Sequence, residues 1–476
     1  MEQTVHAQIS STKEVGEERG HPYQVLAAVM LGGIMGPIDG SIVNVVLPTI
    51  GASFGVPIST VQWVPMSYLL TISSLLMFFG RLGVIVGYRR VYLWGLGGFV
   101  LASVMCGLAP TAPWLIGCRA LQGLAAGMMM AVPFAIITAS FPPEERGKAL
   151  GINAISISAG LAIGPSLGSL ITSLLGWRFV FLVNLPIGIA GLFFAARTLP
   201  SIRGESGGID WTGAISGSLA LLGLLLFVNR AQTGDPSVLA WCTLVLAILA
   251  GAFFLGAEKK APSPLLDLGL FANVVFSLGL LAALLSFMSQ YVLVFLTPFY
   301  LHRVLSLPPN KVGLVMTASP LAVMLIAAFS GWLSDRVGTR TLACVGAGVS
   351  SIALALMAQL PANALPREVA LRLALFGLGT GIFQSPNNSA VMGSVPKPRL
   401  GTASGMLATM RNVGMVLGVA LAGLVVYALA PPEVLRKASL TPMEAQTFLH
   451  AFRHALAVGS LLSAGAAVVS LARRAR

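Results

Sequence analysis

Long apolar runs, separated by short polar or proline-containing connections, fill the chain from residue 23 to residue 472. A helix needs about 20 mostly apolar residues to cross a bilayer, and the runs are of this order. The pattern therefore predicts an all-α polytopic membrane protein with fourteen transmembrane helices. They are expected at residues 23–48, 60–83, 91–109, 113–139, 147–175, 179–197, 210–229, 237–257, 271–300, 311–333, 341–360, 367–393, 400–428 and 451–472.

Composition agrees with a membrane protein and excludes several other classes. Of the 476 residues, 56% are hydrophobic and 9% are charged, and the mean hydropathy is +0.86. A soluble domain carries about 25% charged residues, so a soluble enzyme and a disordered chain are excluded. The sequence has neither a CxxC pair nor a phosphate-binding P-loop motif. We therefore expect no enzyme, no metal, no cofactor and no ATP drive.

The positive charges predict how the chain lies in the membrane. The net charge is +13, and the connections on the side of the N-terminus carry about twice as many lysines and arginines as those on the other side. Because cytoplasmic loops are the positive ones, both termini are expected in the cytoplasm, and the protein is expected in the cell (inner) membrane as a multi-pass protein. The basic charge is thus a topology signal, and nucleic acid is not an expected partner.

Two patches of sequence occur twice. The segment from Gly80 to Arg89 reappears as Gly331 to Arg340. At nearly the same spacing, Arg119, Pro133 and Arg146 are matched by Arg372, Pro386 and Arg399. Such a duplication indicates two parallel six-helix halves with a substrate site between them. The predicted organisation is a cytoplasmic tail (1–22), an N-terminal bundle (23–205), a two-helix insert (206–262) and a C-terminal bundle (263–476).

Several short motifs give the chain a resemblance to a known family. They are the runs from Asp39 to Pro48, Gly80 to Arg90, Arg119 to Gly123, Gly160 to Gly168 and Trp177 to Pro186. By their order and position, the chain resembles the major facilitator superfamily, with the major facilitator fold in a 6 + 2 + 6 arrangement. Within that superfamily it is similar to the fourteen-span drug:proton antiporters. The resemblance covers nearly the whole chain.

Asp39 is the only acidic residue well inside a predicted span, since the other fifteen lie in the N-terminal tail, in loops or at helix ends. A carboxyl group in the bilayer favours its neutral, protonated form, whereas a nearby cation favours the ionised form. By helix rise, Asp39 lies about 13 Å and Arg119 about 9 Å below the outer membrane surface, and the resemblance places their helices side by side. We therefore predict that Asp39 carries the coupling proton and that Arg119 modulates it. The alternative is a static ion pair.

Polar side chains at similar depth are candidates for a substrate cavity. They are Gln122, Asn184, Gln290, Gln384, Asn387, Asn388 and Arg411. The alternative for each amide is a hydrogen bond between helices. Two roles fit Arg411, which either faces an anionic substrate group or is capped by carbonyl groups.

Gly160, Gly164 and Gly168 recur every four residues and form an antiporter helix motif with Pro165. Small residues at this spacing let helices approach closely, and proline bends a helix. The motif predicts a bendable seal between the halves. Ordinary helix packing is the alternative.

The duplicated loops are candidates for cytoplasmic gates. Their residues are Gly80, Arg81, Gly87, Arg89 and Arg90 in the first half, and Asp335, Arg336, Gly338 and Arg340 in the second. The resemblance implies an acidic latch residue where this chain has Val84, which puts the latch in doubt. The alternative is that these arginines only anchor the topology.

Together these features predict a proton-coupled secondary active exporter of hydrophobic or amphiphilic compounds that works by alternating access. One membrane carboxylate offers few anchors for doubly charged cations, so neutral, singly cationic or zwitterionic substrates are expected. The expected partners are protons, these small substrates and membrane lipids, and the protein is expected to be a monomer. The alternatives are a lipid or lipid-precursor transporter on the same fold and a non-transporting membrane sensor.

Overall fold

The computed structural model describes residues 21–142, 145–200, 211–231, 238–258, 268–396, 399–437 and 440–473. Nearly all of the predicted tail and the boundaries predicted at residues 205 and 262 lie outside this part of the chain. Each predicted span coincides with a helix or a pair of consecutive helices. The helices are α2 (Pro22–Phe54), α3 (Ile58–Val61), α4 (Trp63–Val86), α5 (Tyr88–Gly107), α6 (Ala112–Ala131), α7 (Pro133–Ser140), α8 (Arg146–Leu175), α9 (Phe179–Leu182), α10 (Asn184–Thr198), α11 (Trp211–Ala231), α12 (Val238–Glu258), η1 (Leu268–Ala272), α13 (Val274–Phe299), η2 (Tyr300–Val304), α14 (Pro309–Met316), α15 (Ala318–Val337), α16 (Thr339–Met357), α17 (Pro366–Gly393), α18 (Leu400–Leu429), α19 (Pro432–Arg436) and α20 (Pro442–Leu471).

The number of spans predicted from sequence is not confirmed. Within the described residues, ten helices are long and apolar enough to cross a membrane, or up to eleven if the bent pair Ile58–Leu76 and Phe78–Val86 counts as one span. Helix α17 is outside this set, since it carries charged residues at its start and the polar Gln384, Asn387 and Asn388 in its second half. A helix that faces other helices or a cavity can carry such polar side chains at little cost.

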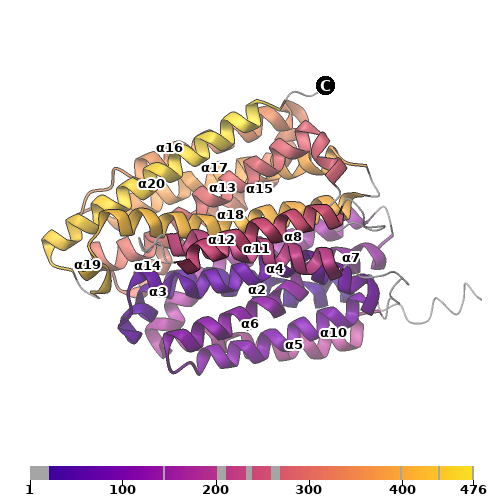
Figure 1. Ribbon diagram of the computed structural model, residues 1–476, viewed down its shortest axis with the longest axis horizontal. Helices are drawn as coiled ribbons and strands as arrows, with labels where there is room; N and C mark the ends of the chain where they lie inside the picture. Colours follow the sequence, from indigo (N-terminus) through magenta and orange to yellow (C-terminus); the bar gives the residue numbers. More distant parts are fainter. Residues whose placement is uncertain are drawn as a thin grey trace, which may run out of the picture.

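The long helices run side by side in one bundle, with two distinct ends (Figure 1). Helix α7 and the C-terminus lie at one end, which we call the terminal end, and α3, α14 and α19 lie at the opposite end. The start of α2 also belongs to the terminal end, because the Tyr23 ring contacts the Phe141 ring directly after α7, with 5.4 Å between centroids.

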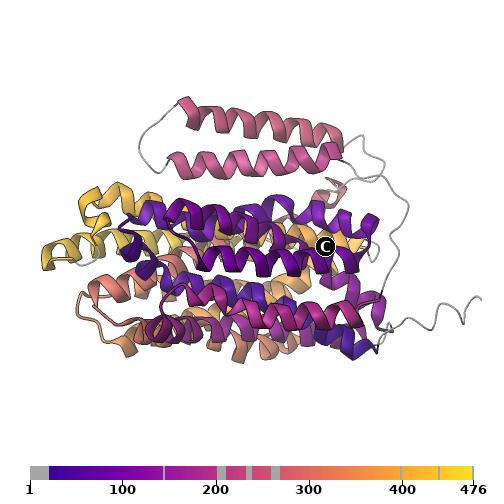
Figure 2. The same ribbon diagram turned by 90° about the horizontal axis from the view of Figure 1, so that it is seen from below.

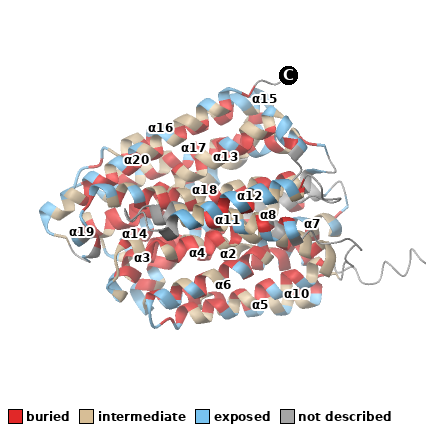
Figure 3. Cartoon of the chain, in the orientation of Figure 1, coloured by how far each residue is buried: buried red, intermediate tan, exposed pale blue. Residues whose placement is uncertain are grey.

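The bundle consists of two groups of helices, each with its own packing. In the first group α2 packs on α8 and α10, and α6 packs on α4 and α5. In the second, α13 packs on α18 and α20, and α17 packs on α15 and α16. Buried residues lie between the helices, and exposed residues lie on their outward surfaces (Figure 3). Those outward surfaces are rich in exposed leucine, phenylalanine and tryptophan, as expected of a surface that faces lipid.

Helices α11 and α12 form a pair that lies beside the two groups (Figure 2). Helix α11 packs against α4 of the first group and α18 of the second. The Ser218 hydroxyl of α11 donates a 2.5 Å hydrogen bond to the Ser74 carbonyl of α4. The pair therefore covers a line where the two groups meet.

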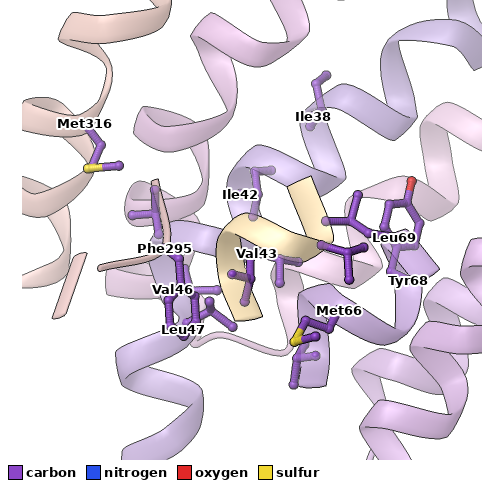
Figure 4. Packing of buried hydrophobic residues seen from close by; sticks show 14 of the residues in the cluster. Ile38, Ile42, Val43, Val46, Leu47, Met66, Tyr68, Leu69, Phe295 and Met316 are labelled. Carbon is purple, nitrogen blue, oxygen red and sulfur yellow. The ribbon is translucent and has the colours of Figure 1, made fainter. Parts of the chain in front are cut away.

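The two groups also meet along α2, α13 and α14. Val46 and Leu47 of α2 belong to the same buried cluster as Phe295 of α13 and Met316 of α14 (Figure 4). At the opposite end, the Ser166 hydroxyl of α8 is 2.6 Å from the Thr317 hydroxyl, directly after α14. The two groups are thus in close contact at the opposite end of the bundle.

Candidate functional site

Asp39 lies in the middle of α2 and is fully buried. Its carboxylate forms an ion pair with Arg119 of α6, which is 1% exposed. A charge in such surroundings is stable only when it is paired and hydrogen-bonded. The structure therefore places the two predicted coupling residues in direct contact.

Amide side chains complete the surroundings of the carboxylate. Gln122 Nε2 and Asn184 Nδ2 each donate a 3.0 Å hydrogen bond to Asp39 Oδ1. The same Gln122 amide donates to the Ser103 hydroxyl at 2.8 Å. Gln122 and Arg119 are three residues apart, so both lie on the face of α6 toward α2. We call Asp39, Arg119, Gln122, Asn184 and Ser103 the Asp39 network.

The Asp39 network is separated from the nearest cavity by an aromatic ring. The guanidinium carbon of Arg119 lies 4.1 Å from the centroid of the Tyr68 ring of α4, which is cation–π distance. Tyr68 also lines the cavity described next, whereas Asp39 and Arg119 do not. Tyr68 thus contacts the ion pair on one side and lines the cavity between the two groups on the other.

Two adjoining cavities lie between the two groups of helices. The central cavity has a volume of about 230 Å³ and is lined by residues of α2, α4, α8, α13, α15, α17 and α18. The second cavity, of about 320 Å³, extends toward the terminal end, where Gly32 of α2, Pro133 of α7 and Ser404 of α18 line it. Residues of both groups, among them Pro37, Gln384 and Arg411, line both cavities.

The structure divides the predicted cavity residues into two sets. Gln290, Gln384, Asn388 and Arg411 line one or both cavities. Gln122, Asn184 and Asn387 line neither, which corrects the prediction for these three. Gln122 and Asn184 belong to the Asp39 network.

Asn387 is held inside the second group of helices. Its Nδ2 donates to the Gly279 carbonyl, and its Oδ1 accepts a hydrogen bond from Arg473, which is buried after the end of α20. The contact of Arg473 with Asn387 ties the last residues of the described chain to α17.

Several site residues were missed by reasoning from sequence. Tyr68, Asn44 and Asn412 line the central cavity, and Ser103 belongs to the Asp39 network. Asn44 lies in the motif that begins at Asp39, and Asn412 follows Arg411 directly, so motif membership was a usable signal for both. Tyr68 and Ser103 carried no signal that separates them from other residues in apolar runs.

The glycine motif of α8 has a different role from the one predicted. A Cβ at Gly164 would lie 1.7 Å from the Ser41 hydroxyl, and one at Gly160 or Gly168 would lie 2.9 or 2.8 Å from an isoleucine side chain of α2. These glycines therefore pack α8 against α2 inside the first group, and do not form a seal between the halves. Pro165, in contrast, lines the central cavity.

The contact between the groups at the opposite end uses another glycine. Gly313 of α14 lies against α8 so closely that a Cβ would be 2.3 Å from the Pro165 carbonyl and 2.0 Å from the Ser169 hydroxyl. A larger side chain at this position would force the two helices apart. Gly313 permits this close contact between the groups, and its partner Pro165 is the proline of the predicted motif.

The duplicated loops have matching geometry in the two halves. Gly87 and Gly338 follow α4 and α15 with φ of 102° and 94°, a conformation that strongly favours glycine. Arg89 donates to the Ala196 carbonyl near the end of α10, and Arg340 donates to the Leu471 carbonyl at the end of α20. Each arginine thus binds the end of the last helix of its own half.

The remaining loop residues differ in their surroundings. The Arg336 guanidinium lies 4.2 Å from the centroid of the Trp332 ring, while Arg90 is exposed. Gly80 has open space around it, and Arg81 is half-buried. The side chain of Asp335 lies outside the described part of the structure.

The sequence matches the profile of the Major Facilitator Superfamily over residues 29–418 and 278–474. The riboflavin transporter RibZ of Clostridioides difficile is 34% identical, over 83% of this chain and 86% of that protein. The tetracenomycin C resistance and export protein of Streptomyces glaucescens is 30% identical, over 85% of this chain and 76% of that protein. The multidrug efflux pump LfrA of Mycolicibacterium smegmatis is 28% identical, over 93% of this chain and 88% of that protein.

Solved structures show the same fold at lower sequence identity. A bacterial homologue of the human drug peptide transporters PepT1 and PepT2 aligns with a TM-score of 0.68 at 13% identity, covering 95% of this chain and 98% of that chain. At this level of identity the match concerns the fold alone.

Proposed function

Because this chain belongs to the Major Facilitator Superfamily, and is therefore a multi-pass membrane transporter and not an enzyme, we propose that it is a proton-coupled exporter of hydrophobic or amphiphilic compounds. We also propose that all fourteen predicted segments span the membrane with both termini in the cytoplasm. Similarity to the tetracenomycin C exporter and to the efflux pump LfrA supports export. The observation that carries the proposal is the buried Asp39–Arg119 pair beside the central cavity.

Protonation of Asp39 supplies the driving step. A neutral Asp39 no longer attracts Arg119, so the ion pair breaks and the guanidinium needs a new partner. The hydrogen bonds that Gln122 and Asn184 donate to Asp39 Oδ1 then lose their charge assistance and weaken. The Asp39 network therefore has two arrangements, one for each protonation state, and a proton selects between them.

Tyr68 couples this step to the substrate. Its ring contacts Arg119 on one side and lines the central cavity on the other. Movement of Arg119 displaces the ring, and a bound compound restricts the ring in return. This reciprocity is what coupled transport requires, because each ligand must favour one state of the same element.

The contact between α8 and α14 supplies the gate that alternates. With the terminal end in the cytoplasm, the close approach of Gly313 to Pro165 closes the outer side, and the second cavity leads inward. Outward release then requires α8 and α14 to separate. Exchange of a proton entering from outside for a compound leaving the cell completes the cycle.

Replacement of Gly313 by valine tests the gate. Overpacking at a tight contact costs about 1–3 kcal/mol, so closure at the outer side should become unfavourable by about tenfold or more. We expect export to fall by a similar factor, measured as dye efflux from cells. The matched control is Gly348→Val in α16, where a Cβ would meet no atom within 4 Å. Equal export by the two variants would contradict the assignment of this gate.

A resistance and accumulation screen tests the proposed function itself. The protein is expressed in a host that lacks its main efflux pumps, and a panel of neutral, cationic and anionic amphiphilic compounds is applied. We expect lower intracellular accumulation of some compounds than in cells with the empty vector, and loss of this difference when a protonophore collapses the gradient. Accumulation that responds neither to expression nor to the protonophore would refute the proposal.

Transport of a flavin-like compound is a second candidate function. The identity of 34% to the riboflavin transporter RibZ favours it. Riboflavin therefore belongs in the same screen, with uptake and efflux both recorded. Saturable riboflavin transport without any effect on the other compounds would replace multidrug export as the function.

A further inference from the structure

Arg411 of α18 lines both cavities and has no described counter-charge. The described ion pairs are Arg119–Asp39 and Lys437–Glu444, and Arg411 takes part in neither. Its buried Nε has no hydrogen-bond partner among the described residues. Arg411 as a whole is half-buried, and a cation in a membrane helix without a counter-charge usually serves a ligand or an ion.

The described lining of the two cavities has no negative charge to balance the guanidinium of Arg411. Among the described residues that line the two cavities there is no aspartate, glutamate, lysine or histidine. Asp39 lines neither cavity, so its carboxylate is not exposed to a bound compound there. The expectation of neutral, singly cationic or zwitterionic substrates counted Asp39 as a possible anchor for a cation. The cavities therefore carry one positive charge and no negative one.

Further polar atoms in the same wall lack partners. Asn412 Nδ2 is a buried donor without a partner, while Asn44 Oδ1 and Gln290 Oε1 are buried acceptors without partners in the part of the chain described. All three residues line the central cavity. Since buried polar groups are nearly always hydrogen-bonded, these atoms have unused capacity for polar groups of a ligand.

Most of the remaining wall is apolar or aromatic. Phe287 and Tyr291 of α13, Leu161 of α8 and Met415 of α18 line the central cavity. Such walls suit flat hydrophobic ring systems. A compound that combines a ring system with one acidic group would match both the wall and the guanidinium.

We infer that Arg411 is the recognition group for an amphiphilic organic anion, an aromatic compound whose carboxylate, sulfonate or ionised phenol pairs with the guanidinium. Donors on Arg411 and Asn412 bind the anionic oxygens, and Asn44 and Gln290 accept from a hydroxyl or amide elsewhere on the ligand. A cationic compound of the same shape meets like-charge repulsion from Arg411. The inference rests on the proposed function, because the ligand is taken to be the transported compound.

The test compares two dyes that share a xanthene ring system, anionic fluorescein at alkaline pH and cationic rhodamine 123. Their binding to the purified full-length protein in detergent is measured by fluorescence anisotropy. We expect fluorescein to bind about tenfold or more tightly than rhodamine 123, and Arg411→Gln to remove this preference. Arg411→Lys should keep part of it, because lysine retains the charge and loses the planar fork. Equal binding of the two dyes by the wild type overturns the inference, as does an unchanged preference in Arg411→Gln.

Two further variants make the result independent of folding. Arg411→Met, whose unbranched apolar side chain suits a cavity wall, is made in parallel and should lose the preference in the same way. Retained rhodamine 123 binding demonstrates that a variant is folded. The matched control is Arg367→Gln, which removes an exposed arginine at the start of α17 and should leave the preference unchanged.

The same assay separates this inference from the proposed function. Asp39 lines neither cavity, so Asp39→Asn should keep the wild-type dye preference. Anion preference without proton-dependent export would refute the exporter and leave the Arg411 site standing. Proton-dependent export without anion preference would refute the Arg411 site alone.

Discussion

Replacing Asp39 with asparagine is expected to abolish proton-driven export while leaving ligand binding intact. Asparagine has nearly the same shape as aspartate, and its carbonyl oxygen can still accept from Gln122 and Asn184. It can neither bind nor release a proton near neutral pH, so the Asp39 network keeps one charge state. Export from proteoliposomes under an imposed pH gradient should fall to the level of protein-free liposomes.

The control for Asp39→Asn changes another acid to its amide. Glu433 is an exposed acid in the short helix α19, and Glu433→Gln should export like the wild type. Both variants should still bind a transported compound, because neither residue lines a cavity. Only Glu433→Gln should keep the wild-type affinity, since Tyr68 couples the charge state of Asp39 to the central cavity. Gradient-driven export by Asp39→Asn at the wild-type rate would remove Asp39 from the coupling step.

Replacing Arg119 with leucine is expected to destabilise the protein strongly. The substitution leaves the Asp39 carboxylate buried without its cation, and removing one member of a buried ion pair costs about 3–5 kcal/mol. It also removes the Arg119 hydrogen bond to the Val64 carbonyl and the contact with the Tyr68 ring. We expect a markedly lower unfolding temperature in detergent, followed by tryptophan fluorescence, and no proton-driven export.

A second substitution distinguishes lost charge pairing from lost packing. In the double variant Asp39→Asn, Arg119→Leu no unpaired charge remains, so most of the thermal stability should return, whereas export should not. Arg372→Leu is the matched control at the repeated position of the second half, where the arginine donates to the Leu356 carbonyl and takes part in no ion pair among the described residues. It should lower the unfolding temperature less than Arg119→Leu. If the double variant were as unstable as Arg119→Leu, the unpaired Asp39 carboxylate would not be the reason for the lower unfolding temperature of Arg119→Leu.

Much of the fold follows from residue type and order alone. Apolar runs place the helices, because backbone groups in lipid must be satisfied within the segment. The repeated Gly87 and Gly338 fix equivalent turns in the two halves, since both adopt positive φ. The one acid that lies away from the ends of the predicted spans identifies Asp39, because an acid is costly there. The sequence therefore determined the transporter class, the helical segments and the most important charged pair.

Only the tertiary structure decided which way each side chain faces. Helix rise fixes the depth of Gln122, Asn184 and Asn387, but depth does not distinguish a cavity wall from a helix contact. A membrane helix that is apolar on all sides has no polar stripe to mark its inner face, so sequence does not give its rotation about its own axis. Packing therefore assigned Gly164 to the contact with α2 and Gly313 to the contact between the groups. Packing also placed Tyr68 between the ion pair and the cavity. The direction in which the Tyr68 ring points depends on the helices around α4, and the sequence of α4 alone does not determine it.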